Sequence, residues 1–175
     1  MSQRISANGM FFRHFKQELS MTLIQELMNQ AAVGGLLNVQ SIQRFTPAEI
    51  RETIQSLVAT EQFDLANALG DAGMSLHPHS ADILAITSLL AMMNQDWSLA
   101  VELIDELIEI QGATTPAFTH VMLVRALRCN LDPARALAAA HQGLAAYPEH
   151  TELTAEAIDL DAYADTMQAP SGYVH

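Results

Sequence analysis

The sequence is poor in cysteine, in β-branched residues and in long apolar runs, and each scarcity narrows the class of protein. Cys129 is the single cysteine among 175 residues, so no disulfide can form within the chain, which fits a reducing compartment. The scarcity of β-branched residues beside abundant Ala, Leu, Met, Gln and Glu favours helices over strands. No run reaches the roughly 20 apolar residues of a membrane span. Arg13 and Lys16 interrupt any secretory-signal pattern at the start. A cytoplasmic protein is therefore expected.

Basic residues are scarce as well. The chain has 8 Lys and Arg against 20 Asp and Glu, a formal net charge of −12. From Glu61 to His120 there are nine acids and no Lys or Arg. Phosphates would be repelled by such a chain, which argues against nucleic acid and anionic membranes as partners. The acidic surface either aids solubility or steers a basic protein partner, and the sequence leaves both readings open.

Motifs of catalysis and of cofactor binding are also missing. The sequence has no Gly-rich phosphate loop, no CxxC pair and no HExxH pattern. His77 and His79 form a His-x-His pair, but no third ligand accompanies them, so no metal site is predicted. We therefore expect neither an enzyme nor a cofactor.

An internal repeat of about 34 residues organises the rest. Two similar junctions, "LHPHS" at residues 76–80 and "AYPEH" at residues 146–150, mark its register. The register gives three segments of two helices each, at residues 47–80, 81–114 and 117–150. A small residue stands early in each second helix, where two helices can cross closely only over a small side chain. These residues are Ala66, Ala100 and Ala136.

Helix starts agree with the register. "TPAE" at residues 46–49 is a capping box followed by proline at the first helical position. Asp96 and Asp132 precede the second helices of the later repeats as expected N-caps, and Thr115 before Pro116 follows the same logic. The residue after Asp96 is Trp97, which shares a repeat position with Phe63 and Pro133. We expect this position to be a buried plug in the hairpin.

These features resemble the tetratricopeptide repeat (TPR) family over residues 47–150. Two departures are visible. The family's turn glycine is replaced by Glu61, Gln95 and Leu131, and the small position of the first helix holds Ile54, Ser88 and Val124. The resemblance implies an all-α fold, a right-handed superhelix of three TPR-like helix hairpins. Residues 1–46 would add an amphipathic N-terminal helix and linker. Residues 151–175 would add a capping helix and a disordered tail, with Leu153, Ala157, Ile158 and Leu160 covering the last repeat.

The family's groove-lining spacing implies a concave protein-binding surface. The implied residues are Arg51, Gln55, Val58, Asp82, Ala85, Leu89, Met92, Met93, Phe118, Val121, Arg125 and Arg128. Leu89 and the two methionines are apolar, and methionine adapts to varied partners. The expected ligand is a protein or peptide, either an amphipathic helix or an extended apolar segment. Alternatively, the groove is filled by the chain's own N-terminal segment or by a dimer mate.

An apolar stripe near the N-terminus predicts self-association, as a homodimer, or packing on the first repeat. It contains Phe12, Phe15, Leu19 and Leu23. The stretches "SLLAMMNQDWSLAVELIDEL" and "MLVRALRCNLDPARALAAA" are similar to TPR chaperones of type III secretion, a virulence system. That resemblance implies a cytosolic chaperone that holds a secretion subunit. The alternative is a TPR scaffold or adaptor for a multiprotein complex.

Overall fold

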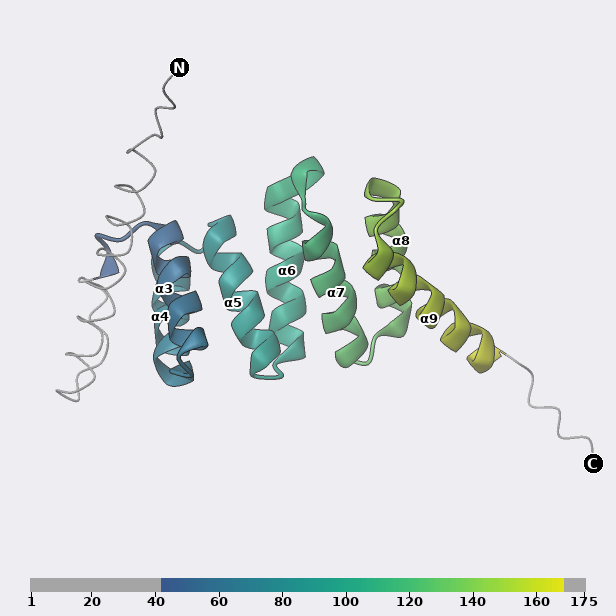
Figure 1. Ribbon diagram of the computed structural model, residues 1–175, viewed down its shortest axis with the longest axis horizontal. Coiled ribbons are helices and arrows are strands. Elements are labelled where there is room, and N and C mark those ends of the chain that lie inside the picture. Colours follow the sequence, from purple (N-terminus) through teal and green to yellow (C-terminus); the bar gives the residue numbers. More distant parts are fainter. Residues whose placement is uncertain (1–41, 169–175) are drawn as a thin grey trace, which may run out of the picture. The chain divides into compact units, whose positions relative to one another are not determined.

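The structure is a computed structural model that describes residues 42–168. Within this range all regular secondary structure is helical, which confirms the all-α prediction (Figure 1). The elements are α3 (Pro47–Ala59), α4 (Phe63–Leu76), α5 (Ala81–Met93), α6 (Trp97–Gln111), the 3-10 helix η1 (Gly112–Thr114), α7 (Ala117–Cys129), α8 (Pro133–Ala146) and α9 (Thr151–Gln168). The chain divides within α5 into two compact units, residues 1–87 and 88–175. The superhelical arrangement of the repeats stays a prediction. None of the helices in the described range is long and apolar enough to cross a membrane.

The turn between the two helices of each repeat has one backbone geometry. Glu61, Gln95 and Leu131 all have positive φ, at 60°, 61° and 60°. In the first repeat the Gln62 N–H donates to the Leu57 carbonyl at 2.9 Å, and the Glu61 N–H donates to the Val58 carbonyl at 3.0 Å. This pair of hydrogen bonds defines a Schellman motif, in which glycine is the usual residue at positive φ. The other two turns repeat both bonds. The missing glycines therefore alter the side chain at this position and leave the turn itself unchanged.

The small-residue position of the second helices is fully buried. Ala66, Ala100 and Ala136 are each 0% exposed. The first helices bury the position that holds Ile54, Ser88 and Val124 to the same extent. A side chain larger than Ala on the second helix would push the two helices apart, because cores are packed at crystal-like density. The sequence argument from the alanines is confirmed.

Two buried glycines show the same packing in different units. A Cβ atom added to Gly73 would lie 3.2 Å from Ile83 Cδ1 in the first unit. One added to Gly143 would lie 2.9 Å from Leu153 Cδ1 and 3.0 Å from His120 Cβ in the second unit. Each glycine thus lets the following helix pack closely against the C-terminal part of the second helix.

Three predicted helix caps are confirmed and one is wrong. Thr46 forms a full capping box with Glu49 at the start of α3. Asp96 accepts a hydrogen bond from Leu99 N, and Asp132 accepts one from Arg135 N. Thr115 does not cap α7, which begins one residue later with Pro116 at its N-cap position. The Thr115 hydroxyl instead donates to the Gly112 carbonyl at 2.8 Å.

The prediction of a buried plug at the start of the second helices is also wrong. Phe63 is 43% exposed and Trp97 is only half-buried. This position is the first residue of its helix, so the turn rather than the partner helix faces it. Full burial would make Trp97→Ala cost about 3–5 kcal/mol, and the half-buried side chain should cost less.

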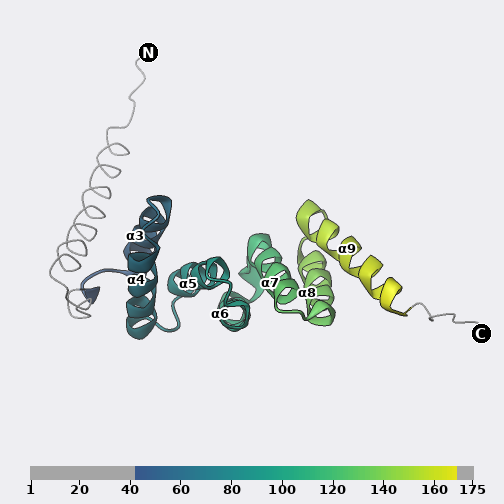
Figure 2. The same cartoon turned by 90° about the horizontal axis from the view of Figure 1, so that it is seen from below.

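Helix α9 covers the last repeat with one face only. Leu153, Ala157 and Leu160 are 0%, 5% and 4% exposed, whereas Ile158 is 62% exposed and does not belong to the covering face as predicted. In Figures 1 and 2, α9 runs at an angle to α8 and diverges from it toward its C-terminal end. The predicted N-terminal helix with Phe12, Phe15, Leu19 and Leu23 lies outside the described residues, as does the tail from residue 169.

Candidate functional site

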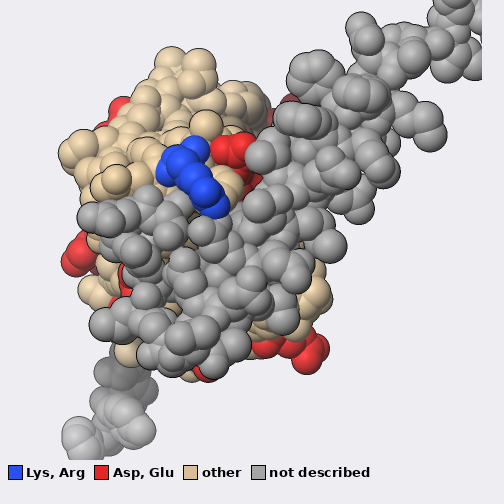
Figure 3. Space-filling view, turned by 90° about the vertical axis from the view of Figure 1, so that its left-hand side faces the viewer, with Lys and Arg blue, Asp and Glu red and all other residues tan. Residues whose placement is uncertain are grey.

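In the first unit, two of the predicted groove residues bind each other. The Arg51 guanidinium and the Asp82 carboxylate form an ion pair from α3 to α5, and each side chain is 36% exposed. The charge of Arg51 is therefore already partnered within the chain. Gln55 is exposed, and Val58 and Ala85 are partly exposed. Figure 3 shows one basic patch on the visible described surface, beside an acidic one.

In the second unit, the predicted apolar residues differ in their access to a partner. Met93 at the end of α5 is 49% exposed, and Phe118 in the first turn of α7 is 57% exposed. Leu89 and Met92 are partly exposed. Val121 is 1% exposed, because it points into the core of the unit, so a partner on the surface cannot touch it. Four of these five side chains remain available on the first helices.

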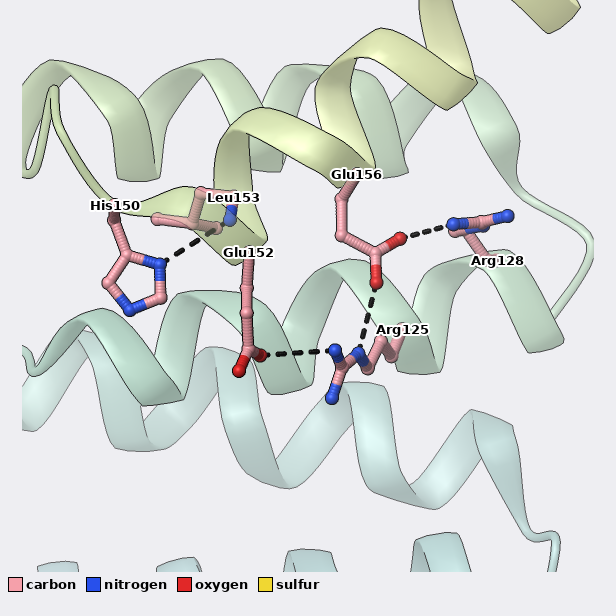
Figure 4. A network of polar contacts seen from close by, with 6 residues as sticks. All are labelled: Arg125, Arg128, His150, Glu152, Leu153 and Glu156. Atoms are coloured by element: carbon pink, nitrogen blue, oxygen red, sulfur yellow. Dashed lines mark hydrogen bonds and ion pairs between the residues drawn. The ribbon is translucent and has the colours of Figure 1, made fainter.

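The two arginines of α7 are held by α9. Arg125 Nε donates to Glu156 Oε1 at 3.0 Å, and Arg125 Nη2 donates to Glu152 Oε2 at 3.1 Å (Figure 4). Arg128 also bonds to Glu156. Nearby, His150 Nδ1 accepts a hydrogen bond from Leu153 N at 3.4 Å at the start of α9. The arginines that we predicted as groove residues therefore tie the capping helix to the last repeat.

Glu156 is the centre of this network. Its side chain is 12% exposed, against 49% and 40% for the two arginines. Burial acts to raise the pKa of Glu156, but the hydrogen bonds and charges of Arg125 and Arg128 outweigh it and lower the pKa overall. The same contacts raise the pKa of Arg125. The carboxylate is thus held ionised between two guanidinium groups.

A spacing of 31 residues would have revealed these ion pairs in the sequence. Arg51 and Asp82 are 31 residues apart, as are Arg125 and Glu156. The spacing is one repeat of about 34 residues less about one helical turn, which brings the same faces of successive first helices together. Charge pairs at that spacing are the signal that our sequence reading missed.

His120 is a buried titratable group outside the predicted surface. It is 5% exposed, and its ring centroid lies 6.2 Å from that of Tyr147. Burial lowers the pKa of His120 below 6.5. Tyr147 in turn donates from its hydroxyl to the Thr115 carbonyl at 2.6 Å. These contacts hold the spacer before α7 against the end of α8. Within residues 42–168, no three His, Cys, Asp or Glu side chains gather as metal ligands would.

Comparison with known proteins places the chain by its fold. No family model matches the sequence, and the search of curated proteins found no match. MamA from Desulfovibrio magneticus RS-1, from residue 41 to its end, superposes with a TM-score of 0.65. Its identity is 12%, over 87% of this chain and 85% of that chain. The Arabidopsis OM64 TPR domain gives 0.58 at 11% identity, over 67% of this chain and 99% of that one.

A third structure, the assembly chaperone of RpL4 (Acl4, residues 1–338), gives a TM-score of 0.55 at 14% identity. The match covers 95% of this chain and 65% of that chain. The predicted kind of fold is confirmed: the chain has a TPR-like helical repeat fold. At these identities the likeness concerns the fold alone.

Proposed function

We propose that the protein is a non-catalytic, protein-binding module that acts as a cytosolic chaperone. It holds an apolar or amphipathic segment of another protein on its first helices. One observation carries the proposal: Met93 and Phe118, on consecutive first helices of the second unit, expose 49% and 57% of their surface. Flanking Leu89 and Met92 are partly exposed. Removing large apolar side chains from water is favourable, so a partner that covers them gains binding free energy. Methionine side chains adapt easily to different partners.

The charge of this surface favours an apolar contact over recognition of an acidic peptide. Arg125 and Arg128 are engaged by carboxylates of α9, and Arg51 by Asp82. Binding of an anionic segment would have to break these pairs. A secretion-system subunit is the ligand class that the sequence resemblance implies. Acl4, a structural neighbour, is named an assembly chaperone, so this fold is compatible with the role.

A scaffold or adaptor is the second candidate, and a different surface favours it. Leu99 and Ile110, both on the second helix α6, are 43% and 44% exposed. An adaptor that joins folded proteins would use these residues as well as the first helices. The two candidates therefore predict different contact residues.

Site-specific photo-crosslinking separates them. A photoreactive phenylalanine analogue replaces Met93 or Phe118 in the full chain, and matched controls carry it at Leu99 or Ile110, which have similar exposure. A chaperone should crosslink one small apolar subunit from the first pair of positions only. Crosslinks from the α6 positions to large folded complexes would support the scaffold instead.

Aggregation of the captured subunit gives the second readout. The wild-type chain should keep that subunit soluble in a light-scattering assay, and Met93→Glu or Phe118→Glu should abolish the protection. Helicity and melting temperature should stay near wild type, because both side chains are about half exposed. Protection that survives both substitutions would refute binding on the first helices.

A further inference from the structure

A cleft lies at the C-terminal end of the second unit, apart from the residues just proposed for cargo. It opens between the α7–α8 turn and the C-terminal half of α9 and has a volume of about 490 Å³. This size falls within the roughly 300–1,000 Å³ of protein ligand pockets. Apolar side chains form most of its wall, namely Leu131, Pro133, Leu160, Ala162 and Tyr163. Arg128 and Asp159 add the polar edge.

Leu131 is the least expected residue in this wall. It is 88% exposed and lies at the positive-φ position of its turn. The two equivalent turns carry polar residues there, Glu61 and Gln95. A leucine at this position is strained, because bulky side chains disfavour positive φ. Its exposure means that no burial within the chain offsets this strain. Tyr163 across the cleft is also 48% exposed. Both side chains are placed to be covered by something outside the unit.

The charge around the cleft defines what can cover it. From Ser88 onward the chain has twelve acidic and three basic side chains. The three arginines form ion pairs within the unit, Arg125 and Arg128 with α9 and Arg135 with Asp105. Asp159 lines the cleft, and Asp165 is exposed further along α9. An apolar segment that carries positive charge is the complement of this surface.

The N-terminus of the chain has this chemistry. Arg4, Arg13 and Lys16 all precede the first acidic residue, Glu18. Interleaved with them is the apolar stripe that begins at Phe12 and Phe15. Residues 1–41 lie outside the described structure, and no other stretch of the chain combines large aromatic side chains with an excess of basic ones. The segment and the cleft belong to opposite ends of the chain.

We propose that the cleft between the α7–α8 turn and α9 binds the basic, aromatic N-terminal segment of a second copy of this chain. Phe12 and Phe15 enter between Leu131 and Tyr163, while Arg13 and Lys16 face the carboxylates of α9. Such a contact is heterologous, so each copy offers one free segment and one free cleft, and assembly grows head to tail.

A fluorescent synthetic peptide of residues 1–17, which holds Arg4, Arg13 and Lys16 and no acidic residue, is the probe. It is titrated into the full chain carrying Phe12→Ser and Phe15→Ser, so that the chain's own segment does not compete. Saturable binding is expected, as is weakening when salt rises from about 0.05 to about 0.5 M, because exposed charges are screened. In that background Leu131→Asn or Tyr163→Ala should weaken binding by about tenfold or more, since burying one large apolar side chain contributes at least that factor.

Two features of the variants keep the test independent of folding. Asparagine tolerates positive φ better than leucine, so Leu131→Asn should keep or raise the melting temperature while binding is lost. Ile158→Ser is the matched control: Ile158 is 62% exposed on the same helix but does not line the cleft. Its effect on peptide affinity should stay within about twofold.

Sedimentation of the wild-type chain gives the second measurement. The mass should rise with concentration, and Leu131→Asn should hold it at the monomer. A peptide that does not bind, or that binds equally well to Leu131→Asn and Tyr163→Ala, overturns the proposal. So does a wild-type chain that stays monomeric at all concentrations, because its segment then does not reach a second copy. Crosslinking of cargo at Met93 is unaffected by these variants, so the cargo proposal and this one fail separately.

Discussion

Replacing Leu131 by glycine should raise the free energy of unfolding, although the change deletes an entire apolar side chain. Leu131 lies at φ 60° in the turn between α7 and α8. An L-residue in this left-handed region is disfavoured by about 1–2 kcal/mol, whereas glycine adopts it freely. Because the side chain is 88% exposed, its removal from the monomer sacrifices almost no burial.

The net magnitude follows from two opposing effects. The relieved backbone strain contributes about 1–2 kcal/mol, and the greater freedom of glycine in the unfolded chain removes about 0.5–1 kcal/mol. A gain of about 0.5–1 kcal/mol remains. Glu61 and Gln95 have the same φ and are also exposed. The triple glycine variant should therefore gain about 2 kcal/mol, since distant sites add, and its melting temperature should rise by several degrees.

Urea unfolding followed by circular dichroism at constant protein concentration measures the effect. Asn130→Gly is the matched control, because Asn130 is exposed, precedes Leu131 and has φ −80°. Glycine there relieves no strain and should lower stability by about 0.5–1 kcal/mol. If Leu131→Gly destabilises the chain as much as Asn130→Gly does, the positive φ at this turn is not imposed by the fold.

Three further predictions concern the second unit. Gly143→Ala should lower the free energy of unfolding by about 0.5–2 kcal/mol in urea melts, because the new Cβ would lie 3.0 Å from His120 Cβ and overpacking outweighs the gain in helix propensity. An unchanged midpoint would contradict that packing. The pKa of the His120 imidazole, measured by NMR, should lie below 6.5. As pH falls below about 6.5 the unfolded chain takes up a proton at this histidine before the folded chain does, so the folded state loses stability. A measured pKa above 6.5 would refute this. Glu156→Gln should cost about 1 kcal/mol at pH 7, because Arg128 loses its carboxylate and Arg125 keeps only Glu152. The folded pKa of Glu156 is lowered, so that difference from wild type should vanish as pH falls below about 4; a difference that persists in acid excludes the ion pairs as its cause.

The repeat register was predictable because it rests on signals that do not depend on tertiary contacts. Thr46 with Glu49, Asp96 and Asp132 cap helices through local hydrogen bonds. Errors arose where burial depends on the partner helix. Trp97 was expected to be buried because it shares a repeat position with Phe63 and Pro133, but this position is the first residue of its helix and is only half-buried. Likewise, Val121 matched the groove-lining spacing, yet α7 turns it into the core.

The candidate site was less predictable than the fold, because its chemistry depends on which charges meet. The sequence predicted Arg125 and Arg128 as groove residues available to a partner, but in the structure both form ion pairs with Glu156 of α9. The cleft beside Tyr163 could not be predicted from a local sequence pattern. Its wall combines residues of the turn after α7 with residues of a helix about 30 positions later. Periodic spacing identifies equivalent positions, but not the angle at which the last helix leaves the array.

The exposed side of α9 also bears on whether a further hairpin could pack against it. Its Thr154, Ile158 and Asp161 stand one repeat after His120, Val124 and Leu127, which are all at most 5% exposed. In α9 these three positions are exposed, and two of them are polar. A fourth hairpin grafted after α9 would have to bury a threonine and an aspartate against its second helix, at an unfavourable desolvation energy. Duplication of a repeat at this end is therefore disfavoured while Asp161 is present, whereas duplication between existing repeats meets no such cost.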